Sequence, residues 1–150
     1  VPTLEGLAYN LYGTDLAVCP LMDARRNQTY TGIYEFIKKD GTCEFDMNII
    51  KGQCAVPIED ILAACNKLDR GVIFLGDGVP VFQKEIEEMI TVPCSYAPAH
   101  MNRQRAAAVA ALAARYYEQG KAQTAAEYKP EYLRLSQAER ERREHEGASG

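Results

Sequence analysis

The sequence lacks any long apolar segment. No apolar run approaches the ~20 residues that a helix needs to cross a bilayer, and the first residues do not show the pattern of a signal peptide. We therefore expect a cytoplasmic protein that has no membrane partner.

An excess of positive charge is also missing. The chain has 17 basic and 21 acidic residues, a formal net charge of −4 and a pI near 5.3. Proteins that coat nucleic acid need a basic field around them. This balance therefore argues against strong, direct nucleic-acid binding.

The five cysteines contain no Cys-x-x-Cys pair. An odd number without that spacing fits neither a disulfide framework nor a zinc knuckle. Cys65, in an apolar stretch, is expected to be a buried thiol that packs as a small hydrophobic group. Reduced cysteines are typical of the cytoplasm.

Candidate bases for catalysis are few, because the only histidines are His100 and His145. Cys94 lies close to His100 in sequence, but Pro93 and Pro98 indicate a loop there. A cysteine nucleophile also needs a base that a third group orients, and the sequence shows neither. No catalytic residue and no metal ligand set is expected from these residues.

At 150 residues, the chain is long enough to bury roughly 70% of its unfolded surface as one domain. The periodicity of apolar residues predicts an alternation of strands and helices. Four helices are predicted, over residues 4–11, from near Pro57 to Leu68, over 82–89 and over 103–119. Five strands are predicted, over residues 16–22, 28–38, 43–47, 72–75 and 90–93.

Three strands in a meander, followed by strand–helix–strand crossovers, predict an α/β fold. The expected result is a mixed five-stranded sheet with helices on its faces. This is the layout of ribonuclease-H-like domains, including those of the actin-like ATPase superfamily.

Several local signals refine this layout. Thr3 is a candidate cap for the first helix, and Pro20 predicts a bulge or a sheet edge because proline cannot donate to a ladder. Asp40 and Gly41 predict a hairpin turn, and Gly120 is placed to end the last helix.

Four carboxylates follow or flank the predicted central strands: Asp23, Glu59, Asp60 and Asp77. In a ribonuclease-H-like sheet they could converge to hold Mg²⁺ for phosphoryl transfer or nuclease chemistry. The alternative, which we favour, is that Asp23 and Asp77 are turn residues. Glu59 and Asp60 would then complement a helix N-terminus.

A short glycine-containing turn, Gly76–Gly78, follows the apolar strand 72–75. Its backbone amides could approach a nucleotide phosphate, which makes Asp23, Gly76, Asp77 and Gly78 weak cofactor-binding candidates. A single Gly-x-Gly is a weak signal, and a structural turn is the favoured interpretation.

Several segments together resemble the TsaB (YeaZ) family of glycoprotease-like proteins. They are 1–4, 20–26 leading into Tyr30, 74–78, Gly120 with Lys121, 130–134 and 136–140. The residues that match the family motifs are Asp23, Ala24, Arg25, Gly76, Gly78, Pro130, Tyr132, Leu133 and Arg134. The resemblance covers nearly the whole chain but only the C-terminal portion of the family.

This resemblance implies a non-catalytic scaffold with an actin-like, ribonuclease-H-like fold. TsaB proteins act with the paralogue TsaD and the ATPase TsaE to install threonylcarbamoyl on an adenosine beside the tRNA anticodon. The His-x-x-x-His metal motif of TsaD is absent from this sequence, and these residues do not support the glycoprotease label. No cofactor is implied.

The resemblance also implies a domain organisation. Residues 1–14 would form a helix that arrives from a preceding domain, 15–134 the ribonuclease-H-like domain, and 135–150 a charged tail. Most of the surface for homodimerisation and for TsaD pairing would lie on the preceding domain. An exposed apolar patch is then expected along the helix 4–11 and around Tyr132.

Overall fold

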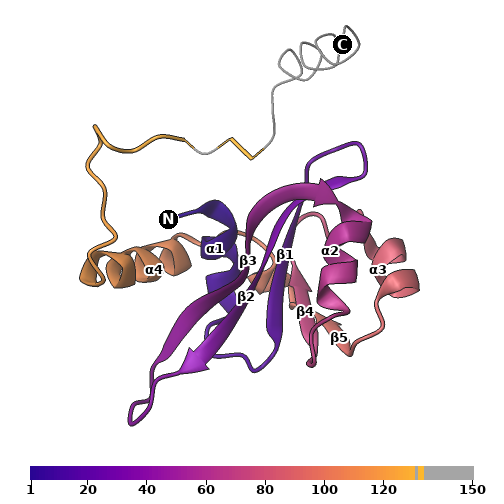
Figure 1. Cartoon of the computed structure of the whole chain (residues 1–150), viewed down its shortest axis with the longest axis horizontal. Coiled ribbons are helices and arrows are strands. Elements are labelled where there is room, and N and C mark those ends of the chain that lie inside the picture. Colours follow the sequence, from indigo (N-terminus) through magenta and orange to yellow (C-terminus); the bar gives the residue numbers. More distant parts are fainter. Residues whose placement is uncertain (131, 134–150) are drawn as a thin grey trace, which may run out of the picture.

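A mixed five-stranded sheet forms the centre of the computed structural model, which describes residues 1–130, 132 and 133 (Figure 1). The strand order is β3-β2-β1-β4-β5. The strands are β1 (Ala17–Asp23), β2 (Gln28–Lys38), β3 (Phe45–Pro57), β4 (Val72–Leu75) and β5 (Cys94–Tyr96).

The pairing directions confirm the predicted layout. Strands β1, β2 and β3 pair antiparallel, whereas β4 pairs parallel with both β1 and β5. An antiparallel meander that continues into parallel crossovers, with the first strand in the middle of the sheet, is the ribonuclease-H-like arrangement predicted from the sequence.

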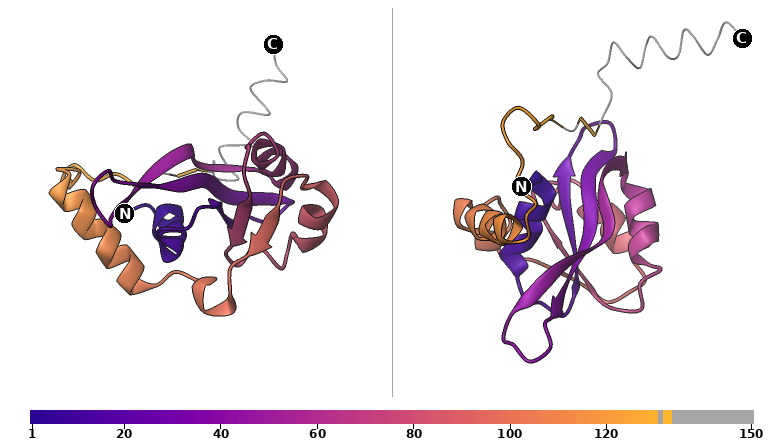
Figure 2. Two further views of the ribbon diagram at one scale, coloured as in Figure 1. Left: turned by 90° about the horizontal axis from the view of Figure 1, so that it is seen from below. Right: turned by 60° about the vertical axis from the view of Figure 1, so that its left-hand side comes forward.

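Helices cover both faces of the sheet (Figure 2). On one face lie α2 (Ile58–Cys65) and α3 (Gln83–Met89). On the other lie α1 (Thr3–Ala8), which continues into a 3₁₀ turn, η1 (Tyr9–Leu11), and α4 (Ala106–Glu118). A second 3₁₀ turn, η2 (Ala99–Met101), precedes α4. None of the helices in the described residues combines the length and apolar character that crossing a membrane requires.

Alternation along β1 divides the core into two layers. Ala17, Cys19 and Leu21 pack with α2 and α3, whereas Val18 packs with α1. All four side chains are fully buried. Because both faces of the strand are covered, its sequence is a continuous apolar run.

Pro20 lies in a central strand, so the predicted sheet edge is wrong. It pairs with Leu75 of β4, and the register shifts of the sheet fall between β2 and β3, around Ile33, rather than at Pro20. The hydroxyl of Thr31 on β2 donates to the Pro20 carbonyl oxygen at 2.8 Å. This side-chain bond satisfies the Pro20 carbonyl, while the residue has no amide hydrogen to donate to the ladder.

Some predicted boundaries are also wrong. The third strand extends to Pro57, which is the residue before α2 rather than part of its first turn. The last strand is Cys94–Tyr96 rather than 90–93, because Ile90 and Val92 pack against the core instead of pairing. Thr3 makes no capping bond, since α1 begins at Thr3 after Pro2.

Two predicted turns are confirmed by left-handed backbone conformations. Gly41 has φ +72° in the hairpin between β2 and β3, and Gly120 has φ +70° after α4. The amide of Lys121 donates to Tyr116 O and that of Gly120 to Tyr117 O, the bonding pattern of a Schellman helix end. Helix α4 begins at Ala106, three residues later than predicted.

Candidate functional site

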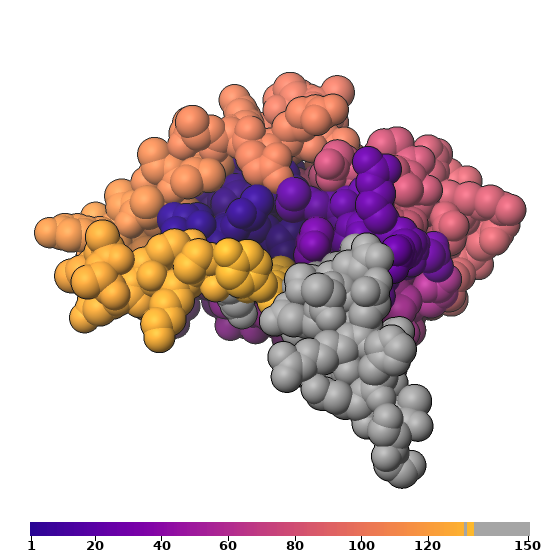
Figure 3. Space-filling view, turned by 90° about the horizontal axis from the view of Figure 1, so that it is seen from above, coloured from indigo at the N-terminus to yellow at the C-terminus, as the bar shows by residue number. Residues whose placement is uncertain are grey.

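The candidate residues of the glycine turn lie at the edge formed by the carboxyl ends of β1 and β4. Because Pro20 pairs in parallel with Leu75, the end of β1 at Asp23 and the turn Gly76–Gly78 are neighbours. Figure 3 looks down on this side of the molecule.

The glycine turn packs against the backbone of β1. Gly76 has φ +111°, and a Cβ atom there would lie 2.1 Å from Leu21 O. The amide of Gly78 donates to Leu21 O at 3.0 Å, and the amide of Gly76 donates to the Asn102 side-chain oxygen at 2.5 Å. Two amides that a phosphate cradle would use are therefore engaged within the protein.

Asp23 organises the hairpin that joins β1 to β2. Its carboxylate accepts the Arg25 amide at 2.8 Å and forms an ion pair with the Arg25 guanidinium at 3.3 Å. Three consecutive residues other than glycine are left-handed: Arg25 (φ 64°), Arg26 (φ 54°) and Asn27 (φ 57°). The sequence does not signal these left-handed residues, because the hairpin lacks the glycine that usually marks such a conformation.

The four predicted carboxylates have different surroundings. Glu59 accepts a hydrogen bond from the Asn27 side-chain amide at 2.8 Å, whereas Asp60 and Asp77 are exposed. Across the part of the chain that the structure describes, no three His, Cys, Asp or Glu side chains are grouped so that they could hold a metal ion. The geometry therefore gives the alternative nuclease mechanism no metal site.

The pair Cys94 and His100 is not assembled into a catalytic unit. Cys94 is exposed on β5, in a segment predicted to be a loop, and His100 is exposed in η2. No hydrogen bond joins these two side chains, both of which the structure describes. The carbonyl oxygen of Pro93 accepts a hydrogen bond from the Val72 amide. Proline cannot donate a backbone hydrogen bond but can accept one, so β5 can begin directly after it.

A wide groove opens between α1, the end of α4 and the segment that follows it. Its volume is about 1340 Å³, and five tyrosines line it. They are Tyr30, Tyr116, Tyr117, Tyr128 and Tyr132. No sequence pattern indicates this groove, since its lining combines residues 1–5, side chains of β1, β2 and β3, and residues between 113 and 133.

Beneath the groove lies a polar cluster inside an otherwise apolar layer. Glu5 is only 8% exposed and accepts a hydrogen bond from the Tyr116 hydroxyl at 2.5 Å. Burial raises the pKa of Tyr116, and the hydrogen bond to Glu5 raises it further. The Tyr34 hydroxyl is buried with no hydrogen-bond partner among the described residues, and burial raises its pKa.

The expectation of an exposed apolar patch is met only in part. Leu4 and Leu7 are buried within the molecule, so the helix does not expose its apolar face. Tyr132 is 85% exposed, and Pro130 is also exposed, whereas Leu133 packs against the layer around α1. The motif residue Arg134 and the tail 135–150 lie outside the described residues.

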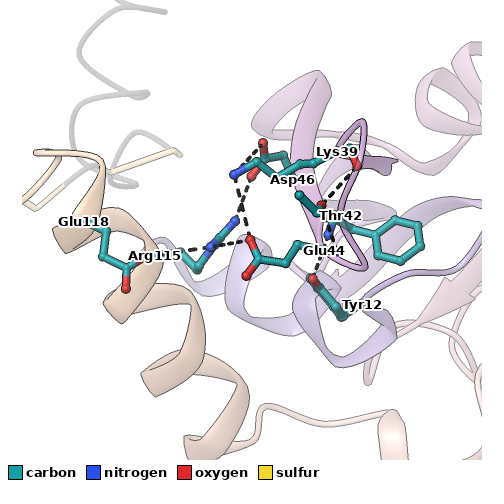
Figure 4. A network of polar contacts seen from close by, with 8 residues as sticks. Tyr12, Lys39, Thr42, Glu44, Asp46, Arg115 and Glu118 are labelled. Atoms are coloured by element: carbon teal, nitrogen blue, oxygen red, sulfur yellow. Dashed lines mark hydrogen bonds and ion pairs between the residues drawn. The ribbon is translucent and has the colours of Figure 1, made fainter.

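An ionic network fixes α4 to the long β2–β3 hairpin (Figure 4). Arg115 donates to Glu44 and to Asp46, each at 3.1 Å, and Lys39 lies 3.7 Å from Asp46. The Phe45 amide donates to the Tyr12 hydroxyl at 2.7 Å. Helix α4 is thereby held in the position that forms one wall of the groove.

The strand order and the two helix layers define a domain of ribonuclease-H-like fold. Two solved structures share it, each with a TM-score of 0.62. One is a Pseudomonas aeruginosa protein described as similar to peptidase YEAZ, 22% identical, with 89% of this chain and 57% of that chain covered. The other is YeaZ from Pseudomonas aeruginosa, 20% identical, with 88% and 58% covered.

The sequence comparisons identify the family. Residues 1–142 match the family model described as TsaD, tRNA N6-adenosine threonylcarbamoyltransferase. The chain is 33% identical over 142 residues to the tRNA threonylcarbamoyladenosine biosynthesis protein TsaB of Bacillus subtilis (strain 168). The chain belongs to the TsaB/YeaZ family within this group. The match covers 93% of the chain and 56% of the Bacillus protein, so the chain spans little more than half of that relative's length.

Proposed function

We propose that this protein is a non-catalytic scaffold component of the machinery that makes threonylcarbamoyladenosine beside the tRNA anticodon. The observation that carries the proposal is the match to TsaB of Bacillus subtilis, at 33% identity over 142 residues. The matching fold, at a TM-score of 0.62 to YeaZ, supports the same assignment.

The chemistry of the described residues supports a scaffold rather than an enzyme. A metal-dependent phosphoryl-transfer site needs carboxylates gathered around one ion, and a cysteine hydrolase needs a thiol oriented by a base. Asp23 is engaged with Arg25 and Glu59 with Asn27, while Cys94 and His100 are exposed without a bond to each other.

We further propose that the protein works with TsaD and TsaE in the cytoplasm. In full-length family members, the tyrosine-lined groove would contact the domain that precedes this one. This agrees with the domain organisation that the resemblance implies. Exposed tyrosines at its rim, such as Tyr117 at 76% and Tyr132 at 85% exposure, are suited to such a contact.

Co-purification tests the scaffold role. The tagged chain, and an extended chain in which it follows the preceding domain of a full-length family member, are each mixed with purified TsaD, with and without TsaE, and retention of TsaD is measured by size-exclusion chromatography. We expect TsaD to elute with the extended chain, because most of the pairing surface is expected on the preceding domain. A matched control carries Val81→Ala and Met89→Ala, two exposed positions on the side of the sheet opposite the groove, and should retain TsaD equally.

A Tyr117→Ala and Tyr128→Ala variant tests the groove. If the groove contacts the further domain, the unsubstituted chain should elute with the purified preceding domain of a full-length family member, and this variant should elute without it although it is folded. Failure of the extended chain to retain TsaD under any of these conditions would contradict the proposed partnership.

A further inference from the structure

The described arginines fall into two groups. Arg25, Arg70 and Arg115 form ion pairs with carboxylates. The other three, Arg26, Arg103 and Arg105, are exposed and form no ion pair within the described chain.

The fold brings these three unpaired arginines to one side of the molecule. The side chain of Gln104, between Arg103 and Arg105, lies 3.5 Å from the Met22 sulfur, directly before the hairpin that carries Arg26. Asn10 donates to the carbonyls of Met101 and Arg103 at 2.8 Å each. Figure 3 shows the violet hairpin protruding on the same face as the orange segment that leads into α4.

The hairpin holds its arginines in a defined position. Left-handed backbone at three successive residues costs energy and persists only where the surroundings enforce it. Here the Arg25 amide is bound by Asp23, the Asn27 side chain by Glu59, and the Asn27 carbonyl by the Ile58 amide at 3.3 Å. The guanidinium groups are presented to solvent, with the Arg25 side chain 86% exposed.

Three carboxylates lie near these groups, fewer than the four arginines. Asp23 is engaged by Arg25, and Glu59 accepts a hydrogen bond from the Asn27 side chain. Asp77 is exposed beside the glycine turn, while the first turn of α4 contains no acidic residue. We call Arg25, Arg26, Arg103 and Arg105 the arginine edge. The net charge of −4 concealed this local excess of positive charge.

We propose that the arginine edge contacts the phosphate backbone of an RNA, which under the proposed function is the tRNA substrate. Arginine binds phosphate through two parallel hydrogen bonds. All four side chains are exposed. Arg26 and Arg103 form no ion pair in the described chain, and Arg25 is paired with Asp23. Arg105 donates to the Met101 sulfur, which leaves its charge without a carboxylate partner. With only three or four such contacts, binding is weak and strongly salt-dependent. This agrees with the expectation that strong nucleic-acid binding is absent.

The surroundings favour RNA over an acidic protein surface. Protein interfaces are built around apolar and aromatic residues that become buried. Among the described residues, the exposed large apolar side chains lie elsewhere, for example at Ile49, Tyr96 and Tyr117, and none falls within 22–27 or 99–107. Phosphate contacts need no such centre.

The test compares two triple variants that remove the same charge. One carries Arg26→Ala, Arg103→Ala and Arg105→Ala. The control carries Lys38→Ala, Lys51→Ala and Lys67→Ala, three exposed lysines on β2, on β3 and in the turn after α2 that form no ion pair in the described chain. Binding of an unmodified tRNA transcript is measured by fluorescence anisotropy from low to moderate salt, after thermal melts show that both variants are folded.

In the arginine variant, we expect the negative slope of log K against log salt to become shallower by about 2–3, as the loss of three phosphate contacts predicts. The lysine variant should leave this slope nearly unchanged. Equal loss in both variants would show a bulk charge effect and overturn the proposal. So would the absence of salt-dependent tRNA binding, or binding of poly-glutamate through the same arginines in place of RNA.

This inference rests on the proposed function, but the two fail separately. If the arginine variant binds tRNA normally while the extended chain still retains TsaD, the scaffold role stands and only the RNA contact is lost. If the chain binds tRNA through the edge but the extended chain does not retain TsaD, the proposed partnership fails and the RNA contact stands.

Discussion

The two faces of the sheet differ in how completely they are closed. The face covered by α2 and α3 has an apolar core in which Phe74, Ile61 and Leu62 are fully buried. The face covered by α1 and α4 contains Glu5, Tyr34 and Tyr116 and opens into the groove. The closed face contributes mainly stability, whereas the open face also carries the groove that we propose as a contact surface.

The largest effect is expected on the closed face. Leu62→Ala removes a fully buried side chain from the core against α2. Because the packed surroundings cannot fill the cavity, we expect a loss of about 3–5 kcal/mol of unfolding free energy. Urea denaturation followed by circular dichroism measures it, and Val81→Ala, at an exposed position, should change it by less than about 0.5 kcal/mol.

A leucine-to-alanine substitution on the open face should lower the unfolding free energy by a smaller amount. Leu4 is 2% exposed but lies at the wall of the groove, where neighbouring side chains can move into the space that Leu4→Ala leaves. We expect a loss of about 2–3 kcal/mol, near the low end for such substitutions. A cost equal to or larger than that of Leu62→Ala in the same denaturation experiment would remove the distinction between the faces.

Tyr116→Phe tests the polar cluster. The substitution deletes the hydroxyl that donates to Glu5 and leaves a nearly buried carboxylate without that donor. We expect a loss of about 1–2 kcal/mol in unfolding free energy. Tyr117→Phe is the matched control, since its ring is largely exposed, and it should be close to neutral. An equal effect of the two variants would show that the hydrogen bond does not stabilise the fold.

The smallest effect, with the opposite sign, is expected at Tyr34. Its hydroxyl is buried without a partner, so its desolvation is not compensated. Tyr34→Phe should therefore leave the melting temperature unchanged or raise it, equivalent to a gain of up to about 1 kcal/mol. A loss of more than about 1 kcal/mol would show that the hydroxyl is bonded, for example to a water beneath the groove.

Local apolar patterns made much of the fold predictable. The segment 72–75, apolar and flanked by glycines, is the buried parallel strand β4, and Gly41 and Gly120 end their elements as predicted. The extent of β3 was not predictable, because Ile49 and Ile50 are exposed on an outer strand. On this outer strand, an apolar residue does not indicate a buried position.

The candidate sites were less predictable, since they depend on contacts between distant parts of the chain. Glu5 and Tyr116 are 111 positions apart, and no spacing rule connects them. The hairpin at Arg25 has left-handed residues without glycine, so the usual signal is missing. The carboxylates suggested by strand ends have different partners or are exposed, because strand order places only the backbone and not the side-chain contacts.

The central claim, that this chain is a non-catalytic scaffold in tRNA threonylcarbamoylation, is tested most directly by a reconstituted reaction. Formation of threonylcarbamoyladenosine in a tRNA transcript is measured by mass spectrometry with TsaD, TsaE, ATP and an activated threonylcarbamoyl donor, with and without the extended chain, and with the chain alone in place of TsaD and TsaE. We expect the chain alone to yield no modified nucleoside and the extended chain, added to TsaD and TsaE, to increase the yield. Product formed by the chain alone, or a yield that the extended chain does not change, would contradict the account.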